Sequence, residues 1–181
     1  MTTKPYLYSE DSKLLGSYLS TIDAMGSFLE IGVGNGGNLL SIATSTRFEI
    51  VVGTDIMELG NVRKELPTKV ELVIADKATC FRGEIFDLVA FNPPYVPSQR
   101  IEDVTTDGGA GGMAVPLQFL SSALTVAKPD GKIVMVLSSE DSLADLEEFC
   151  DSRGLRSKKV AEKPLFFETL FVFLIMRPRA F

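Results

Sequence analysis

The chain has 181 residues, of which 45% are hydrophobic and 23% charged, so it carries enough apolar side chain for one compact core. This excludes a disordered or collagen-like protein, and we expect a single domain over 1–181. The longest apolar run, 170–176, is far shorter than the ~20 residues that cross a bilayer. The N-terminus has no apolar stretch typical of a secretory signal, so we expect a cytoplasmic protein.

The chain contains no histidine and only two cysteines, Cys80 and Cys150. Transition-metal sites and nucleophiles activated by histidine need residues that are absent here, so we expect no metal site. We interpret both cysteines as reduced thiols without a catalytic role. Acid–base chemistry then falls to carboxylates, lysine or tyrosine, unless the reaction needs no strong base.

The net charge of −6 is unevenly distributed along the chain. Residues 152–181 hold seven basic and two acidic side chains, a balance of +5, which leaves −11 for residues 1–151. An acidic body repels a phosphate backbone and suits a basic partner, so direct nucleic-acid binding is not expected. The basic C-terminal part is interpreted first as the solvated face of a hairpin.

Taken in chain order, the apolar pattern predicts short strands alternating with helices, which is typical of βαβ units. A helix over 10–25 begins near Ser9 and is followed by the first strand over 28–33 and a helix over 37–44. The remaining predicted elements are strands 48–54, 70–75, 86–91 and 132–137, helices 57–66, 116–127 and 142–150, and two last strands over 155–161 and 166–176.

The link between the last two strands, 162–164, is too short for a parallel crossover, so these strands should form an antiparallel hairpin. The predicted fold is therefore α/β, with a mostly parallel seven-stranded sheet, a C-terminal antiparallel hairpin and helices on both faces. We expect Ser142 to cap the last helix. Segment 95–112 is predicted to be an irregular loop, because 108–112 is too rich in glycine for a helix or a strand.

Three predicted strands end on polar side chains: Asp55, Asp76 and Asn92. In open α/β sheets, ligands bind beyond the carboxyl ends of the strands. We therefore expect these three side chains to face one crevice.

The segment 30–37, Glu-Ile-Gly-Val-Gly-Asn-Gly-Gly, lies at a strand-to-helix turn, where glycines let a ligand approach backbone N–H groups. The pattern fits a dinucleotide site, an S-adenosylmethionine site or a purely structural turn, and Asp55 would serve either ligand by accepting from ribose hydroxyls. Glu30 favours S-adenosylmethionine, because a carboxylate suits a positively charged amino acid tail better than a pyrophosphate.

The segment Asn92-Pro93-Pro94-Tyr95 follows the fourth predicted strand. Its prolines lack N–H groups and fix φ, which leaves carbonyl groups free to accept from a ligand. The Asn92 side-chain oxygen and the Pro93 carbonyl can accept both hydrogens of a planar NH2 group, and Tyr95 can stack on that group. An isolated NPPY would be interpreted as a structural turn, but its place after a glycine turn and a strand favours a substrate site.

These motifs resemble class I S-adenosylmethionine-dependent methyltransferases that act on planar nitrogens. The chain is most similar to the short archaeal and eukaryotic branch of the HemK-like release-factor glutamine methyltransferases. Segment 6–12, the continuation of NPPY as Tyr95-Val96-Pro97, and the pair Gly111-Gly112 all resemble that branch. Two features depart from it: Tyr8 replaces a proline, and a tryptophan expected before the glycine pair is absent.

The resemblance implies S-adenosylmethionine as the cofactor, with Glu30, Gly32 and Gly34 along its methionine part, Asp55 on the ribose and Asp76 on the adenine amino group. It places Asn92, Pro93, Pro94 and Tyr95 at a substrate amide, and Glu10, Asp11, Gly36 and Asn92 near the cofactor.

The implied substrate is the glutamine of the GGQ loop in a class I release factor, and the implied partner is a small zinc-binding activator subunit. We expect an apolar interface surface from Phe166, Phe167, Phe171 and Phe173 together with strand 70–75.

Other functions stay open at this point. A nucleic-acid N-methyltransferase would use the same NPPY chemistry on an exocyclic base amine, but it would need a basic footprint. A nicotinamide-dependent oxidoreductase would leave NPPY unexplained. A catalytically silent cofactor-binding scaffold would not need Asn92.

Overall fold

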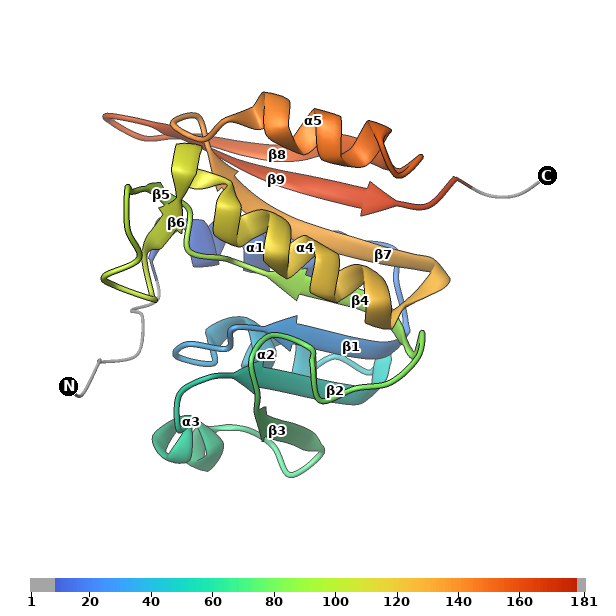
Figure 1. Ribbon diagram of the computed structural model, residues 1–181. Coiled ribbons are helices and arrows are strands. Elements are labelled where there is room, and N and C mark those ends of the chain that lie inside the picture. The colour runs from blue at the N-terminus through green and yellow to red at the C-terminus, as the bar shows by residue number, and fades with distance from the viewer. Residues whose placement is uncertain (1–8, 179–181) are drawn as a thin grey trace.

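The computed structural model describes residues 9–178 of the chain (Figure 1). In chain order the elements are α1 (Glu10–Thr21), β1 (Gly26–Ile31), α2 (Gly37–Ala43), β2 (Phe48–Asp55), α3 (Gly60–Glu65), β3 (Val70–Ile74), β4 (Phe86–Phe91), β5 (Val96–Pro97), β6 (Asp107–Gly109), the 3-10 turn η1 (Ala110–Gly112), α4 (Ala114–Val126), β7 (Ala127–Ser138), α5 (Leu143–Asp151), β8 (Arg156–Pro164) and β9 (Thr169–Met176).

Seven strands form one sheet in the order β3-β2-β1-β4-β7-β9-β8. Neighbouring strands from β3 to β7 are parallel, whereas β9 pairs antiparallel with both β7 and β8. The predicted α/β fold with a C-terminal antiparallel hairpin is thereby confirmed. Because β1 to β4 are parallel, their carboxyl ends lie at one edge of the sheet, to the left in Figure 1.

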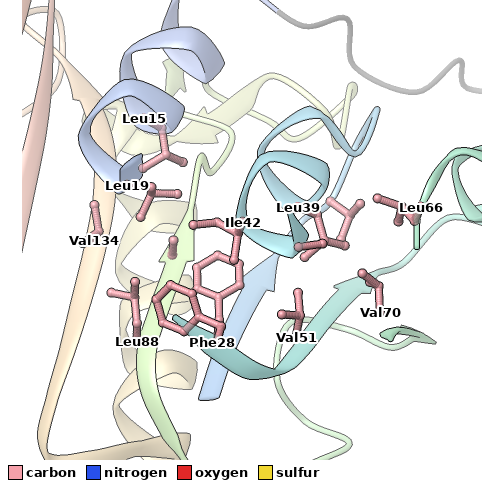
Figure 2. Packing of buried hydrophobic residues seen from close by; sticks show 14 of the residues in the cluster. Leu15, Leu19, Phe28, Leu39, Ile42, Val51, Leu66, Val70, Leu88 and Val134 are labelled. Carbon is pink, nitrogen blue, oxygen red and sulfur yellow. The ribbon is translucent and has the colours of Figure 1, made fainter. Parts of the chain in front are cut away.

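Helices cover both faces of the sheet, so the central strands are apolar on both sides. On one face, Leu15 and Leu19 of α1 and Ile42 of α2 pack with Phe28 of β1 and Leu88 of β4 (Figure 2). The opposite face packs against α4 and α5, and the neighbouring strand residues alternate onto it. Burial of each large side chain contributes roughly 1.5 to 3 kcal/mol, so these two layers hold the strand ends in place.

Helix α1 shows how the sequence determines where a helix begins and which of its faces packs against the sheet. Ser9 is its N-cap residue, and the acidic Glu10 and Asp11 occupy the first turn, where the helix dipole favours negative charge. Leu15 and Leu19 are fully buried one turn apart on the face toward the sheet. Residues 9–178 contain no helix with both the length and the apolar character needed to cross a bilayer.

The glycine-rich segment is more regular than the sequence predicted. Residues 107–109 form β6, which pairs with β5 as a separate two-stranded sheet, and residues 110–112 form a 3-10 turn. The expectation that 108–112 adopts neither strand nor helix was therefore wrong. Positive φ angles at Gly109, Gly111 and Gly112 allow this chain path, which residues with a β-carbon rarely adopt.

Several predicted boundaries also differ from those observed. Residues 162–164 belong to β8, so the hairpin turn lies at 165–168 rather than at 162–164. Ser142 occupies the N-cap position of α5 but its side chain makes no capping hydrogen bond. Strand β7 begins at Ala127 instead of 132, and α3 covers only 60–65.

The predicted joint apolar surface of the phenylalanines and β3 does not exist. Strand β3 lies at one edge of the sheet and β8 at the other, and Phe171 and Phe173 lie on β9, which is paired on both sides. The two apolar groups are therefore separate surfaces. Tyr6 and Tyr8, used in the N-terminal resemblance, lie outside the described residues.

Candidate active site

A cavity of about 680 Å³ opens at the carboxyl ends of β1 to β4, within the size range of small-molecule sites. The predicted site residues that line it are Asp11, Glu30, Gly32, Gly34, Asp55, Asp76, Asn92, Pro93, Pro94 and Tyr95. The structure thus brings the three strand-end residues together, as the parallel topology predicts. Glu10 and Gly36 do not line this cavity.

The two outlying residues have other surroundings. Glu10 forms ion pairs with Lys13 and Lys163, whose hydrogen bonds and, to a smaller extent, charges lower the pKa of its carboxyl to about 2. Gly36 has φ +80° at the start of α2, and a β-carbon there would lie 2.5 Å from Cγ1 of Val62. Glu10 therefore links α1 to the hairpin, and Gly36 allows α2 to approach α3 closely.

The glycine turn after β1 forms one wall of the cavity. Gly32 and Gly34 have positive φ angles, and the Gly32 N–H donates to the carbonyl of Thr54 at 2.8 Å. The Gly34 N–H donates to Oδ2 of Asp55 at 3.0 Å. The turn is thus fastened to the end of β2, with bare backbone facing the cavity.

Glu30, the last residue but one of β1, is 3% exposed and lines the cavity. Burial, which outweighs hydrogen bonds from the Asn38 side chain and the Leu39 backbone, raises the pKa of its carboxyl to about 8. The nearby Asp55 charge raises it further. The Oε2 atom has no hydrogen-bond partner among the described residues. A buried carboxyl with an open acceptor is suited to a cationic group entering the cavity.

Asp55 ends β2 with both carboxylate oxygens fixed in place. Oδ2 accepts from Gly34, and Oδ1 accepts from the Met57 N–H at 2.9 Å. Each carboxylate oxygen can accept more than one hydrogen bond, so the group retains capacity for hydroxyl donors. The hydrogen bonds orient the carboxylate before any ligand binds.

Asp76 follows β3 and is largely exposed at the cavity rim. It pairs with Lys77 at 2.7 Å, and the Lys77 ammonium lies 5.5 Å from the ring centroid of Phe119. Phe119 of α4 also lines the cavity and lies close to Gly32. A flat aromatic wall with an acceptor beside it is suited to a planar ring that carries an amino group.

Asn92 and Pro93 lie directly after β4, at the boundary between the cavity and the protein core. Oδ1 of Asn92 is inaccessible to solvent and has no hydrogen-bond partner among the described residues. Pro93 is buried and cannot donate, so it offers only its carbonyl oxygen. An unsatisfied buried acceptor costs about 1 to 3 kcal/mol, and a ligand N–H at this point would recover that free energy.

The Tyr95 hydroxyl donates to Oδ2 of Asp11 at 2.9 Å, across 84 residues of sequence. This bond ties the start of α1 to the NPPY segment. Asp11 is buried, and its Oδ1 also accepts from the Ser12 N–H at 2.6 Å. Asp11 is therefore placed to position Tyr95, in addition to its place in the cavity wall.

Sequence reasoning missed two residues that line the cavity, Asn38 and Phe119. Asn38 hydrogen-bonds to Glu30 from the first turn of α2, and no local pattern indicates that contact. Phe119 reaches the cavity only because α4 packs across the sheet.

Taken together, four features of the cavity fit S-adenosylmethionine: a buried carboxyl group with an unsatisfied oxygen, an oriented aspartate at a strand end, a glycine turn with accessible backbone, and an aromatic wall with an acceptor beside it. Asn92 lines the same cavity, so a second ligand bound there would lie beside this residue.

Among solved structures, a chain of the E. cuniculi Mtq2–Trm112 complex, which is responsible for methylation of the eRF1 translation termination factor, matches this fold with a TM-score of 0.78. It is 23% identical, and the match covers 97% of this chain and all of the other. An rRNA methylase from Streptococcus thermophilus gives 0.66 at 14% identity over 96% and 100% of the two chains. The N-methyltransferase NodS of Bradyrhizobium japonicum, solved with S-adenosylhomocysteine, gives 0.64 at 16% identity over 93% and 86%. The fold is that of the Rossmann-like methyltransferases.

A candidate protein N5-glutamine methyltransferase of Methanocaldococcus jannaschii is 30% identical over 179 residues, which cover 92% of this chain and 89% of the relative. The chain belongs to this family of protein glutamine methyltransferases. No protein-family model matches it.

Two longer relatives match part of their length. The release factor glutamine methyltransferase of Caulobacter vibrioides is 27% identical over 65% of this chain and 47% of its own length. The eRF1 methyltransferase catalytic subunit of Schizosaccharomyces pombe is 27% identical over 52% of this chain and 45% of its own. The chain thus spans about half the length of these two relatives.

Proposed function

We propose that this protein transfers a methyl group from S-adenosylmethionine to a planar amide nitrogen, the glutamine side chain in the GGQ loop of a class I release factor. The observation that carries the proposal is the buried, unsatisfied side-chain oxygen of Asn92, a residue that lines, together with Pro93, the cavity that fits the cofactor. Membership of the glutamine methyltransferase family and the names of the relatives support the same substrate.

On the cofactor side, the chain supplies acceptors at three separated points. The Glu30 carboxylate would bind the α-ammonium group, and Gly32 and Gly34 would leave room for the methionine part. The oriented Asp55 carboxylate would accept from the ribose hydroxyls, and Asp76 would accept from the adenine amino group beside Phe119. S-adenosylmethionine, when bound, supplies an electrophilic methyl group on its sulfonium sulfur.

On the substrate side, Asn92 and Pro93 hold the amide. An amide nitrogen is a weak nucleophile because its lone pair is delocalised into the carbonyl. The Asn92 oxygen and the Pro93 carbonyl accept its two hydrogens, so they fix its orientation and stabilise the positive charge that develops on nitrogen as the methyl group arrives. One of these protons is then lost to solvent, so no strong base is required in a chain without histidine.

A small activator subunit is part of the proposal. Strand β3 is an edge strand with one unpaired side, and its last residue, Ile74, is 65% exposed. An open strand edge with apolar side chains is a surface that natural proteins cover. The complex of the E. cuniculi Mtq2 protein with a partner, Trm112, supports a subunit at this chain, for which we propose a zinc-binding fold.

The test is a methyl-transfer assay with labelled S-adenosylmethionine and a purified class I release factor. Label should enter the release factor, survive nuclease, be lost on protease treatment, and be absent when the GGQ glutamine is replaced by alanine. Label on RNA or DNA that disappears with nuclease would instead establish the nucleic-acid alternative. Adding a small zinc-binding subunit should raise the rate, and no change in rate would remove the partner from the proposal.

A further inference from the structure

Two adjacent phenylalanines occupy the tip of the β8–β9 hairpin. Phe166 and Phe167 are 91% and 88% exposed, more than any other large hydrophobic side chain that the structure describes. Their rings contact each other edge to face, with centroids 4.6 Å apart. Side chains of this size bury 150–250 Å² each in interfaces, so full exposure of both is unusual without a binding role.

The hairpin tip is held in place by hydrogen bonds. The Leu165 N–H donates to the carbonyl of Glu168 at 2.8 Å and closes the turn. The Ser139 N–H donates to the Thr169 carbonyl at 2.9 Å, and the Thr169 N–H donates to the Ser139 hydroxyl at 3.0 Å. Ser138 also hydrogen-bonds to the Glu168 carboxylate. The tip is therefore fastened to the end of β7, and the phenylalanines are presented on an ordered support.

This support lies on the same side of the molecule as the active-site cavity. Strand β7 runs parallel to β4, and its last residue, Ser138, is opposite Leu170 of β9. The turn between β8 and β9 therefore projects beyond the carboxyl ends of β4 and β7. Figure 1 shows the hairpin turn and the β5–β6 segment projecting on one side of the sheet.

A short series of contacts joins the hairpin to the NPPY segment. A β-carbon at Gly112 would collide with the Asp141 carboxylate and would approach the Tyr95 carbonyl oxygen to 2.5 Å, so Gly112 touches both residues. The Ser142 N–H donates to the Gly111 carbonyl at 2.9 Å. The glycine pair thus bridges the segment after β7, which holds the hairpin, and the segment after β4, which holds Asn92.

Three acidic side chains lie at the support of the tip: Glu168 is in the turn, and Glu140 and Asp141 follow β7. Glu140, Asp141 and Glu168 are close enough that the Glu168 and Glu140 charges, together with burial, which is the larger effect, raise the pKa of Asp141 to about 7. Lys163, the basic residue nearest the tip in sequence, is already paired with Glu10. The negative charge of Glu140 and Glu168 repels anionic lipid headgroups and phosphate backbones and attracts basic side chains.

We propose that the Phe166–Phe167 tip is a docking point for the protein substrate, which presents an apolar side chain to the two rings and a basic flank to Glu140 and Glu168. This inference rests on the proposed function and names the surface by which that substrate is recognised. A cavity of about 680 Å³ holds a cofactor and one side chain, so the body of a protein substrate must contact the surface outside it. Two phenylalanines fall far short of the ~800 Å² per partner of a stable interface, so they suit a secondary anchor better than a dimer contact.

The test compares the double variant Phe166→Ser/Phe167→Ser with the control Met25→Ser/Ile50→Ser. Met25 and Ile50 are also exposed, at 68% and 56%. Met25 directly precedes β1 and Ile50 lies near the amino end of β2, so both are at the opposite end of these strands from the cavity. Steady-state kinetics are measured with an intact release factor and with a short GGQ peptide. Affinity for the release factor is measured separately by calorimetry in the absence of cofactor.

For the phenylalanine variant, KM and Kd for the intact release factor should rise about tenfold, with kcat, peptide kinetics and cofactor affinity unchanged. The control should match the wild type. Unchanged kinetics and affinity for the intact release factor would overturn the docking proposal while leaving the proposed function standing. A loss confined to binding of anionic vesicles, or to self-association in ultracentrifugation, would also overturn it. A wild-type protein that methylates neither release factor nor peptide would refute the proposed function itself.

Discussion

Glu30 is a buried carboxyl group whose protonation is coupled to folding. Its pKa of about 8 lies above the value near 4.5 that it has in an unfolded chain, so the folded protein binds a proton that the unfolded chain releases between these values. Folding stability should therefore fall as pH rises from about 5 to 8, and Asp141, with a pKa raised to about 7, adds to the same trend.

Replacing Glu30 with glutamine should flatten this dependence. In urea unfolding without cofactor, the Glu30→Gln variant should be more stable than the wild type by roughly 2 to 4 kcal/mol at pH 8, with little difference at pH 4.5. The same variant should bind S-adenosylmethionine more weakly, because it lacks the carboxylate that we propose binds the ammonium group. If the free energies of unfolding of the two proteins changed with pH in the same way, Glu30 would not be buried as described.

Asp55 should contribute to cofactor affinity, because its oriented carboxylate can accept hydrogen bonds from the ribose hydroxyls. Asp55→Ala is expected to weaken S-adenosylmethionine binding by on the order of 1 to 3 kcal/mol, the range for hydrogen bonds to charged groups. Calorimetry against the wild type measures this, with Asp130→Ala, an exposed aspartate near the far end of β7, as the matched control. Unchanged affinity in Asp55→Ala, or wild-type affinity for NADH equal to that for S-adenosylmethionine, would remove the ribose assignment.

At the scale of elements, the contact between α2 and α3 depends on Gly36. Its positive φ and the nearby Val62 side chain both oppose a β-carbon, so Gly36→Ala should lower the free energy of unfolding by about 1 to 3 kcal/mol. Gly60→Ala is the matched control, because no atom lies within 4 Å of a β-carbon there and its φ is not positive. It should be neutral or slightly stabilising in the same urea titration. Equal losses in both variants would show that the Val62 contact is not the cause.

The elements that were predicted well are those with strong local patterns. Phe86–Phe91 is a mostly buried apolar run that ends at the polar Asn92, and its observed bounds are those predicted. The pairing of β5 with β6 was missed because it depends on bonds such as that from the Ser98 N–H to the Gly109 carbonyl, which local composition does not encode. Strand β7 is longer than predicted because Gly131 lets the chain pass close to the Phe86 carbonyl, again through a tertiary contact.

In the candidate site too, features that follow from topology were predicted and features that depend on tertiary packing were missed. Asp55, Asp76 and Asn92 were found because parallel topology brings strand ends together, whatever packs on the sheet. The Tyr95–Asp11 bond and the Asn38–Glu30 bond join helices to strand ends, and their geometry follows from how α1 and α2 pack. Gly36 satisfied the glycine motif in sequence but faces α3, because the turn leaves the cavity before it reaches that residue.

At the scale of the whole molecule, the sheet separates three surfaces. The β3 edge has an unpaired side, where we propose that a small subunit binds, the carboxyl ends of the parallel strands hold the cavity, and the β8–β9 tip lies outside the cavity lining. A substrate can therefore contact the hairpin and enter the cavity while β3 is covered. The acidic body, at −11 over residues 1–151, favours a basic protein surface over a nucleic acid on this side.

The proposed reaction depends on Asn92 to hold the substrate amide. Single-turnover methyl transfer to a release factor by an Asn92→Ala variant tests this role most directly. Losing one preorganised acceptor should slow transfer by about 100- to 1000-fold, or ~3 to 4 kcal/mol, while cofactor affinity, measured in parallel by calorimetry, stays within a few-fold of the wild type. Asn92→Asp, which keeps an acceptor, should be less impaired. Transfer by Asn92→Ala at the wild-type rate would contradict the account, because the amide would then be held and activated somewhere else.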